Sequence, residues 1–222
     1  MGKLKGHRVM RGTLKCVTGV RIGGSKESQE IGGTDNPILR HPITNFPYVP
    51  GSSLKGKVRS LLEQKHRADK VMRDGKPCDC GACDVCRVFG CAGARNTKSS
   101  TRAIFRDCML TPESKAVLEE ARAELGVPYS ETKTEVLIDR RTGLSYGRIG
   151  PRTQERIPEG AEFDLEIVLR VFDDDDPDKD AQFIQEGLKL LQDDTLGGSG
   201  SRGYGKVSIE IKDTVDTWKT AS

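Results

Sequence analysis

Phe163-Asp164-Leu165-Glu166-Ile167-Val168-Leu169-Arg170-Val171 is the stretch that decides the fold. Its odd-numbered residues are all apolar, and alternation of this kind is typical of a β-strand that buries one face. We therefore predict a strand over residues 162–172. Beyond it, apolar residues at intervals of three and four predict a helix over 180–192, and renewed alternation predicts a closing strand over 206–212.

The first half of the chain repeats this order. It predicts a strand over 8–17, a helix over 53–66 and a strand over 102–109. The order strand–helix–strand–strand–helix–strand is that of the ferredoxin-like fold, which RNA-recognition domains share. We expect a single α+β domain over 1–222, interrupted by two long insertions, the first at about 18–52 and the second at about 110–161, and by a separate cysteine-containing insertion at about 67–101. Insertions this long usually carry function.

Composition places the chain among ordinary globular proteins. Its 222 residues are 35% hydrophobic and 31% charged. No apolar run is long enough to cross a membrane, and the first ten residues lack a signal-peptide core. We expect a cytoplasmic protein with no membrane partner.

The charges are segregated along the chain. The net charge is +3, yet residues 173–180 hold six Asp and one Lys, which leaves +8 on the remainder. Residues 36–62 contain four Lys or Arg and no acid, and residues 87–106 contain five and no acid. Such basic stretches are typical of nucleic-acid binders, although a solvated basic face has the same composition. We interpret the aspartate run as a solvated loop, because it lacks the spacing and glycine of an EF-hand.

Five of the seven cysteines fall within fourteen residues: Cys78, Cys80, Cys83, Cys86 and Cys91. Such clustering in a chain without a signal peptide favours metal over disulfides. The first four predict a tetrahedral structural zinc site that staples this insertion, with His66 or Cys91 as an alternative ligand. An iron–sulfur cluster stays open as a rival. The ferredoxin motif for such a cluster has three residues between its third and fourth cysteines, and a proline follows the fourth. Here four residues separate Cys86 from Cys91, and an alanine follows Cys91.

Glycine-rich segments follow the first predicted strand and precede the last, at 22–37 and 196–206. Glycine lets backbone N–H groups approach a ligand closely, and nearby Lys and Arg favour an anion. The second segment approaches a Walker A loop, but Val207 replaces the required hydroxyl and a strand follows, which argues against a nucleotide triphosphatase. We expect it to hold a nucleic-acid backbone through Arg202 and to stack a base on Tyr204. An ordinary turn is the alternative.

The start of the helix over 53–66 has unusual chemistry. Ser52 or Ser53 can cap it, but Lys55 and Lys57 then lie in the first turn, where the helix dipole disfavours cations. A glycine between them costs about 1 kcal/mol more than alanine. Both features suggest that an anion binds at the helix start. Lys55 and Arg59, four residues apart, would then share one face along a row of phosphates.

Asp35 lies in the first glycine-rich segment, at the entrance to this basic region. An aspartate before Asn-Pro is most often a turn former, so a functional role is the less common outcome from sequence alone. The second insertion carries Glu131, Glu135 and Asp139, followed by five arginines. The chain shows no Ser or Cys nucleophile triad, and none of its three histidines has an evident catalytic partner.

Together these segments resemble the RAMP superfamily of CRISPR proteins, and within it the backbone subunits of type III-A (Csm) effector complexes. The likeness covers nearly the whole chain. It is carried by residues 18–24 (TGVRIGG), 33–37 (GTDNP), 43–57, 87–90 (RVFG), 138–140 (IDR), 151–156 (PRTQER) and 196–205 (LGGSGSRGYG). Each motif alone is weak, but their order and number make the match specific.

The resemblance implies a hand-like subunit that stacks in several copies along a CRISPR RNA. The ferredoxin-like core would be the palm, and the second insertion would include a β-hairpin thumb that kinks the guide–target duplex. The family cuts bound complementary target RNA with the aspartate that matches Asp35 and a divalent ion such as Mg2+. The adjacent 2′-hydroxyl attacks in line and leaves a cyclic phosphate. Arg21 stands where many relatives carry histidine, so we expect it to bind phosphate.

The RNA-binding residues that we expect are Arg21, Ser52, Ser53, Lys55, Lys57, Arg59, Arg140, Arg152, Arg156, Gly198, Gly200, Arg202 and Tyr204. The expected partners are the CRISPR RNA, its complementary target RNA, further copies of this chain stacked in a filament and other Csm subunits. The alternative is a non-catalytic CRISPR RNA-binding scaffold, as in DNA-targeting complexes. An enzyme that processes precursor guide RNA is a third possibility, which the lack of a histidine site disfavours.

Overall fold

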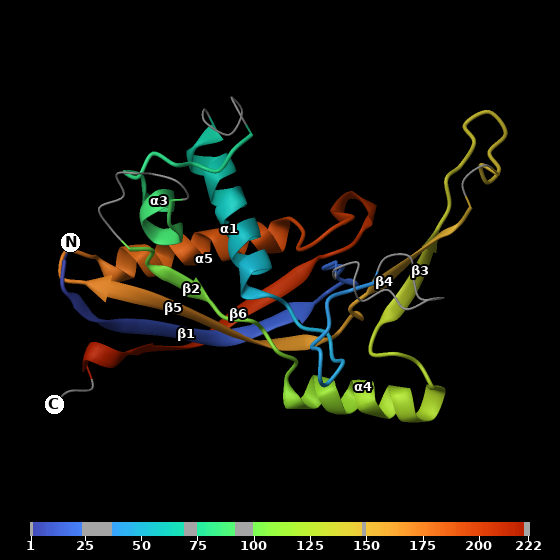
Figure 1. Cartoon of the computed structure of the whole chain (residues 1–222), viewed down its shortest axis with the longest axis horizontal. Helices are drawn as coiled ribbons and strands as arrows, with labels where there is room; N and C mark the ends of the chain where they lie inside the picture. The colour runs from blue at the N-terminus through green and yellow to red at the C-terminus, as the bar shows by residue number, and fades with distance from the viewer. Residues whose placement is uncertain (1, 24–36, 69–74, 92–99, 148–149, 220–222) are drawn as a thin grey trace.

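The structure is a computed structural model that describes residues 2–23, 37–68, 75–91, 100–147 and 150–219. Its centre is a four-stranded antiparallel sheet (Figure 1). The strands are β1 (Leu4–Cys16), β2 (Ala103–Phe105), β5 (Glu162–Phe172) and β6 (Val207–Asp216), in the spatial order β2-β5-β1-β6. The chain is thus an α+β protein, as the sequence predicts.

Helices α1 (Gly51–His66) and α5 (Pro177–Asp193) pack on this sheet and on each other. Their apolar stripes join the inward residues of β1 and β5 in one core, in which Leu14, Leu54 and Ile184 are fully buried. Gly187 lies where the two helices come closest, because a Cβ there would meet the side chains of Val58 and Leu62. The opposite face of the sheet carries exposed ion pairs such as Arg11–Glu166.

The boundaries of α1 correct one expectation. The helix begins at Gly51, and Pro50 occupies the N-cap position without a side-chain hydrogen bond. Ser52 and Ser53 therefore lie inside the first turn and do not cap the helix, while Lys55 lies beyond that turn. Strand β2 is also shorter than the predicted 102–109, and β6 runs four residues further than the predicted 212.

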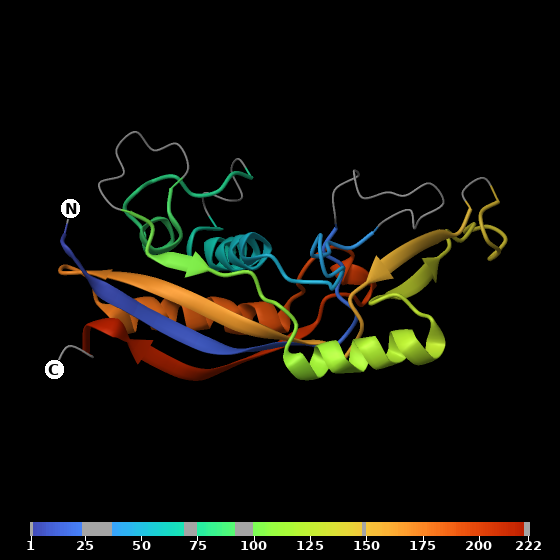
Figure 2. The same ribbon diagram turned by 60° about the horizontal axis from the view of Figure 1, so that its bottom comes forward.

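The insertion between α1 and β2 contains one short described helix, α3 (Asp84–Phe89). The second insertion contains helix α4 (Pro112–Leu125), which the sequence analysis missed, and the paired antiparallel strands β3 (Glu131–Glu135) and β4 (Arg152–Arg156). Figures 1 and 2 show this ribbon extending away from the end of the main sheet, with α4 beside its base. Two short 3-10 helices, η2 (Gly200–Arg202) and η3 (Thr217–Lys219), complete the described elements.

The aspartate run is only in part the solvated loop that the sequence suggested: Asp173, Asp174, Asp176 and Asp178 are exposed, but Asp175 and Asp180 point inward. Asp175 accepts two hydrogen bonds from the buried Arg102, at 2.9 and 2.8 Å. Asp178 pairs with Arg8, and Asp180, 2% exposed, pairs with Arg87. Arginines from distant parts of the chain thus converge on this run, which could not be seen without the fold. Because Arg87 and Arg102 are neutralised internally, the basic stretch 87–106 contributes less to a nucleic-acid surface than its composition indicates.

In the parts of the chain that the structure describes, no helix combines the length and apolar character needed to cross a bilayer.

Candidate nucleic-acid interface and metal centre

The second glycine-rich segment meets residues 19–21, which lead into the first, beside the end of β1. Arg21 forms a parallel bridge with Gly197, and its carbonyl oxygen accepts a hydrogen bond from the N–H of Gly198 at 2.8 Å. The N–H of Gly205 donates to the carbonyl of Gly19 at 3.0 Å. Gly197 and Gly205 have positive φ values of 84° and 80°, and a Cβ at either would run into backbone. The close approach therefore requires glycine at both positions.

The second segment presents backbone donors at its turn. Ser199 adopts a left-handed conformation with φ 65°, and η2 begins directly after it. The first N–H groups of a helical turn have no partner within the turn, and a left-handed residue before them forms a concave donor site for anions. Gly198 and Arg202 are exposed on this segment, and Gly200 is partly exposed. The arrangement suits a phosphate oxygen.

Tyr204 is fully buried, so the expectation that it stacks on a base is wrong. Its hydroxyl donates to Glu135 Oε1 at 2.8 Å. Lys133 Nζ and Arg156 Cζ each lie 4.7 Å from the ring centroid. Burial, and then the bond to Glu135, raise the pKa of Tyr204. The sequence showed a tyrosine among glycines but not the hairpin strands that cover it.

The base of the hairpin carries a groove of about 440 Å³ between β3, β4 and the second glycine-rich segment. Its lining includes three cations, Lys133, Arg152 and Arg202, and one carboxylate, Glu135. Arg202 Nη1 lies 2.5 Å from Glu135 Oε2. On the same strand, Glu131 holds Arg156 at 2.6 Å. Thus two of the arginines expected to bind RNA are paired with β3 carboxylates, for which the sequence analysis proposed no role.

The cations of α1 also have internal partners. Lys55 Nζ donates to the carbonyl of Ala103 at 2.9 Å, and burial lowers its pKa. Arg59 donates to Glu63 at 2.9 Å and to the carbonyl of Cys78 at 2.7 Å. Lys57 lies 3.3 Å from Asp194. Ser52 is exposed on this helix, and Arg140 is exposed at the far end of the hairpin.

Asp35 lies outside the described residues, but hydrogen bonds hold the residues that follow from 37 on. Gly23 bridges Ile38, and Leu39 N donates to the carbonyl of Ile22 at 2.9 Å. Glu155 on β4 accepts hydrogen bonds from the N–H of Ile38 at 2.8 Å and from Arg40. The sequence analysis quoted Glu155 within a motif without proposing a role for it.

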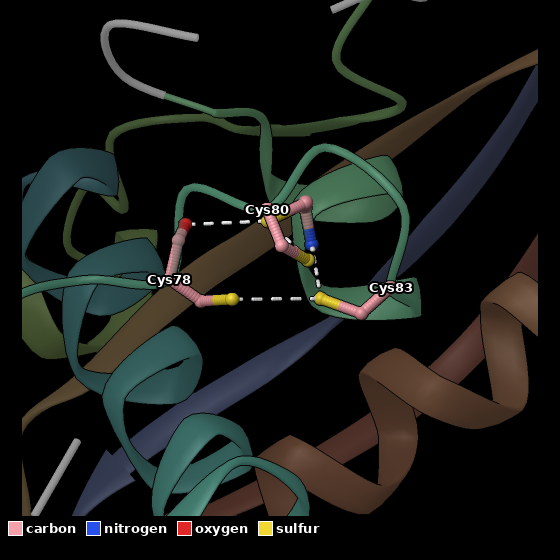
Figure 3. Close-up of side chains that lie close together, drawn as sticks. Cys78, Cys80 and Cys83 are labelled. Carbon is pink, nitrogen blue, oxygen red and sulfur yellow. Dashed lines mark hydrogen bonds between the residues drawn. The ribbon is translucent and has the colours of Figure 1, made fainter. Parts of the chain in front are cut away.

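The four cysteines Cys78, Cys80, Cys83 and Cys86 converge, with all four sulfur atoms within 4.8 Å of one another (Figure 3). The Cys78 and Cys83 sulfurs are 3.8 Å apart, and the Cys80 and Cys86 sulfurs are 3.9 Å apart. A tetrahedral zinc ion with Zn–S bonds of about 2.3 Å needs sulfurs roughly 3.8 Å apart. The donor set therefore fits zinc.

The other two candidate ligands lie elsewhere. His66 Nε2 lies 3.0 Å from Glu186, and the cluster found among the described residues does not include Cys91. The backbone N–H and C=O of Cys78 both form hydrogen bonds with side chains of α1, which fixes the cluster to that helix. Glu63, 5% exposed, accepts from Cys78 N at 2.9 Å, while Arg59 donates to the Cys78 carbonyl.

Comparison with known proteins gives consistent matches. The RAMP superfamily model matches residues 13–208. A protein named CRISPR system Cms endoribonuclease Csm3 from Methanocaldococcus jannaschii is 43% identical over 210 residues, 93% of this chain and 79% of that protein. Its namesake from Methanothermobacter thermautotrophicus is 44% identical over 214 residues, 91% of this chain and 83% of that protein.

Two solved structures are also similar. One is a chain of the Csm3-Csm4 subcomplex in the type III-A CRISPR-Cas interference complex, with a TM-score of 0.59 and 29% identity, covering 98% of this chain and 93% of that one. The other is Methanopyrus kandleri Csm3, with a TM-score of 0.62 and 28% identity, covering 95% of this chain and 77% of that one.

Proposed function

The chain belongs to the RAMP superfamily, as a Csm3-type member, and from this premise we propose that it is the guide-RNA-binding backbone subunit of a type III-A CRISPR effector complex. In that complex it cleaves complementary target RNA at regular intervals. The observation that carries the proposal is identity above 40% across more than nine-tenths of the chain with proteins named Csm3 endoribonucleases.

The sheet is the palm of this subunit and has the ferredoxin-like arrangement. Support comes from the core order β1-α1-β2-β5-α5-β6, since the spatial order β2-β5-β1-β6 with every pair antiparallel is what this topology requires. The ribbon β3–β4 is the thumb. Because one core joins all these palm elements, residues 1–222 form a single RAMP domain.

Guide RNA binds across the meeting point of the two glycine-rich segments and the base of the thumb. Arg21, Gly198, Gly200 and Arg202 contact phosphates there, and Arg152 and Arg156 extend the site along β4. Ser52, Ser53, Lys55, Lys57 and Arg59 supply the helix side, with Ser52 the most accessible of them, and Arg140 contacts RNA from the thumb tip. Lys55 and Arg59 also position the backbone beside this helix, through their hydrogen bonds to the carbonyls of Ala103 and Cys78.

Asp35 is the catalytic residue. Its carboxylate oxygens are suitable ligands for Mg2+ or a similar divalent ion, which stabilises charge on the cleaved phosphate when bound. The thumb holds the target strand so that the 2′-hydroxyl next to the cleaved phosphate attacks in line. The 2′-oxygen–phosphorus bond forms as the hydroxyl loses its proton, the phosphorus–5′-oxygen bond breaks, and the products are a cyclic phosphate and a protonated 5′-hydroxyl. Glu155 holds Ile38 and Arg40 in the described segment that follows Asp35 in the sequence.

The four clustered cysteines hold a structural zinc ion that staples the insertion to α1. The sulfur spacings support this role, and the contacts of Glu63 and Arg59 with Cys78 connect the site to the palm. None of these contacts reaches the proposed RNA site, so zinc supports the fold rather than the chemistry.

Copies of this chain stack head to tail, and two exposed surfaces support the arrangement. No residue of α4 is buried, although Val117, Leu118 and Ala121 form an apolar stripe along a groove of about 670 Å³. Four glutamates and no lysine or arginine line this groove. The thumb tip carries the complementary set, with the exposed apolar residues Leu137, Ile138 and Leu144 beside Arg140 and Arg141. Other Csm subunits close the ends of the stack.

Cleavage of labelled complementary RNA by a complex assembled on a defined guide tests the function. We expect regularly spaced cuts that a chelator stops. Asp35→Ala should abolish them while assembly and target binding persist, and Asp213→Ala, an exposed carboxylate on β6, should cut normally. Continued cutting by Asp35→Ala at an unchanged rate would leave the non-catalytic scaffold as the better description.

A further inference from the structure

Glu135 lies among the cations that line the groove at the base of the hairpin, and it forms an ion pair with one of them, Arg202. Its side chain is 17% exposed, and its two oxygens are divided between partners on the second glycine-rich segment. Oε2 lies 2.5 Å from Arg202 Nη1, and Oε1 accepts the Tyr204 hydroxyl at 2.8 Å. These bonds, that of Tyr204 first, lower the pKa of Glu135 and keep it ionised.

The surroundings of Glu135 are otherwise cationic. Lys133 lies two residues before Glu135 on β3, and Arg152 on β4 lies directly opposite Glu135. Three cations thus line a groove in which Glu135 is the one lining carboxylate. A carboxylate and a phosphodiester each present two negatively charged oxygens to an arginine. A phosphate can therefore take the place of Glu135 at Arg202.

We propose that Glu135 is an internal competitor for RNA: it holds Arg202 in the free protein, and an RNA phosphodiester displaces it on binding. This inference rests on the proposed RNA-binding function. The exchange lowers affinity for every polyanion and, when RNA binds, releases one of the two bonds between Glu135 and the glycine-rich segment, while the bond to Tyr204 remains. An RNA that also contacts Lys133 and Arg152 recovers this cost, whereas an isolated anion does not.

Removing the charge at position 135 tests the idea. Glu135→Gln keeps an acceptor for Tyr204 but releases Arg202. It should bind fluorescein-labelled single-stranded RNA up to about fivefold more tightly in fluorescence anisotropy, because partly exposed ion pairs are worth up to about 1 kcal/mol. The log–log salt dependence should stay unchanged, since the phosphodiester contacts Arg202 in both proteins and the number of neutralised phosphates is the same. The matched control is Glu166→Gln, which releases Arg11 on the open face of the sheet.

A double-mutant comparison separates competition from a structural role. In an Arg202→Ala background, Glu135→Gln should give no gain in affinity. A gain that persists there, or wild-type-like or weaker binding by a Glu135→Gln protein with unchanged melting temperature, would overturn the inference. If Glu135→Gln does not fold, Glu135→Asp, with a shorter reach to Arg202, should bind more tightly than the wild type. Absence of RNA binding in every variant, wild type included, would instead overturn the proposed function.

Discussion

Glu155 shows how much one buried carboxylate can organise. Its side chain is 10% exposed and accepts hydrogen bonds from Ser130 Oγ at 2.6 Å, Ile38 N at 2.8 Å and Arg40. Burial alone would raise the pKa of Glu155, but these donors reverse that effect and lower it. The ionised form is therefore the one that ties β4 to the segment after Asp35.

Glu155→Gln should lower the free energy of unfolding at pH 7 by about 1–3 kcal/mol, because charge-assisted bonds become neutral ones beside the partly buried Arg40. At about 2–4 °C per kcal/mol, this is a measurable fall in melting temperature. A depressed folded-state pKa contributes stability above the unfolded value, near 4.3, and that contribution disappears as pH falls through the folded pKa. The difference from wild type should thus shrink in acid. Thermal scans against pH test this, with the exposed Glu159→Gln as control; a pH-independent difference would contradict it.

Single residues also mark the limit of sequence reasoning. The glycines at 197 and 205 could be predicted as sites of close backbone approach, because glycine alone tolerates such conformations. The burial of Tyr204 could not be predicted, since Glu135, which accepts its hydroxyl hydrogen bond, is 69 positions away in the chain. The arginines paired with the aspartate run were hidden in the same way.

Elements with a strong apolar period were predictable. The prediction for β5 agrees with the observed Glu162–Phe172, because its alternation comes from burial of one face on the core. The strands β3 (ETKTE) and β4 (RTQER) have no apolar alternation, so the hairpin was expected only from resemblance to a family. Helix α4 had start signals, with Thr111 as N-cap and Pro112 after it, but its apolar stripe lies among many charges and went unrecognised.

At the scale of single elements, the four-cysteine cluster beside α3 gives a testable prediction. Protein purified without added metal should contain one zinc per chain, and Cys83→Ser should lose it and lower the melting temperature, because ligand binding is coupled to folding. Cys91→Ser, outside the cluster, should keep the metal. Elemental analysis with thermal scans checks both. A brown protein that contains iron and sulfide would contradict the zinc assignment.

Across the whole molecule, the proposed docking surfaces are different patches of one chain. The groove beside α4 is acidic and apolar, whereas the thumb tip is basic and apolar, and the two lie on separate parts of the second insertion (Figure 1). A patch that fits a different patch on the next copy gives a heterologous contact. Repeated contacts of this kind generate an open filament rather than a closed dimer. The head-to-tail stacking that we propose is thus supported by the distribution of charge and apolar area within one chain.

RNA-free protein should therefore associate beyond a dimer as its concentration rises in analytical ultracentrifugation. Val117→Arg in the groove and Leu144→Glu at the tip, both at exposed positions (63% and 69%), should each give monomers without loss of melting temperature. An equimolar mixture of the two should form a one-to-one pair and stop there, because the intact tip of one variant binds the intact groove of the other and both surfaces that remain free carry a substitution. Leu4→Glu, at the far end of the sheet, should associate like the wild type. The charge exchange Glu113→Arg with Arg141→Glu should restore association that either change alone weakens. A wild-type symmetric dimer, or a mixture that stays monomeric, would show that the groove and the tip do not bind each other.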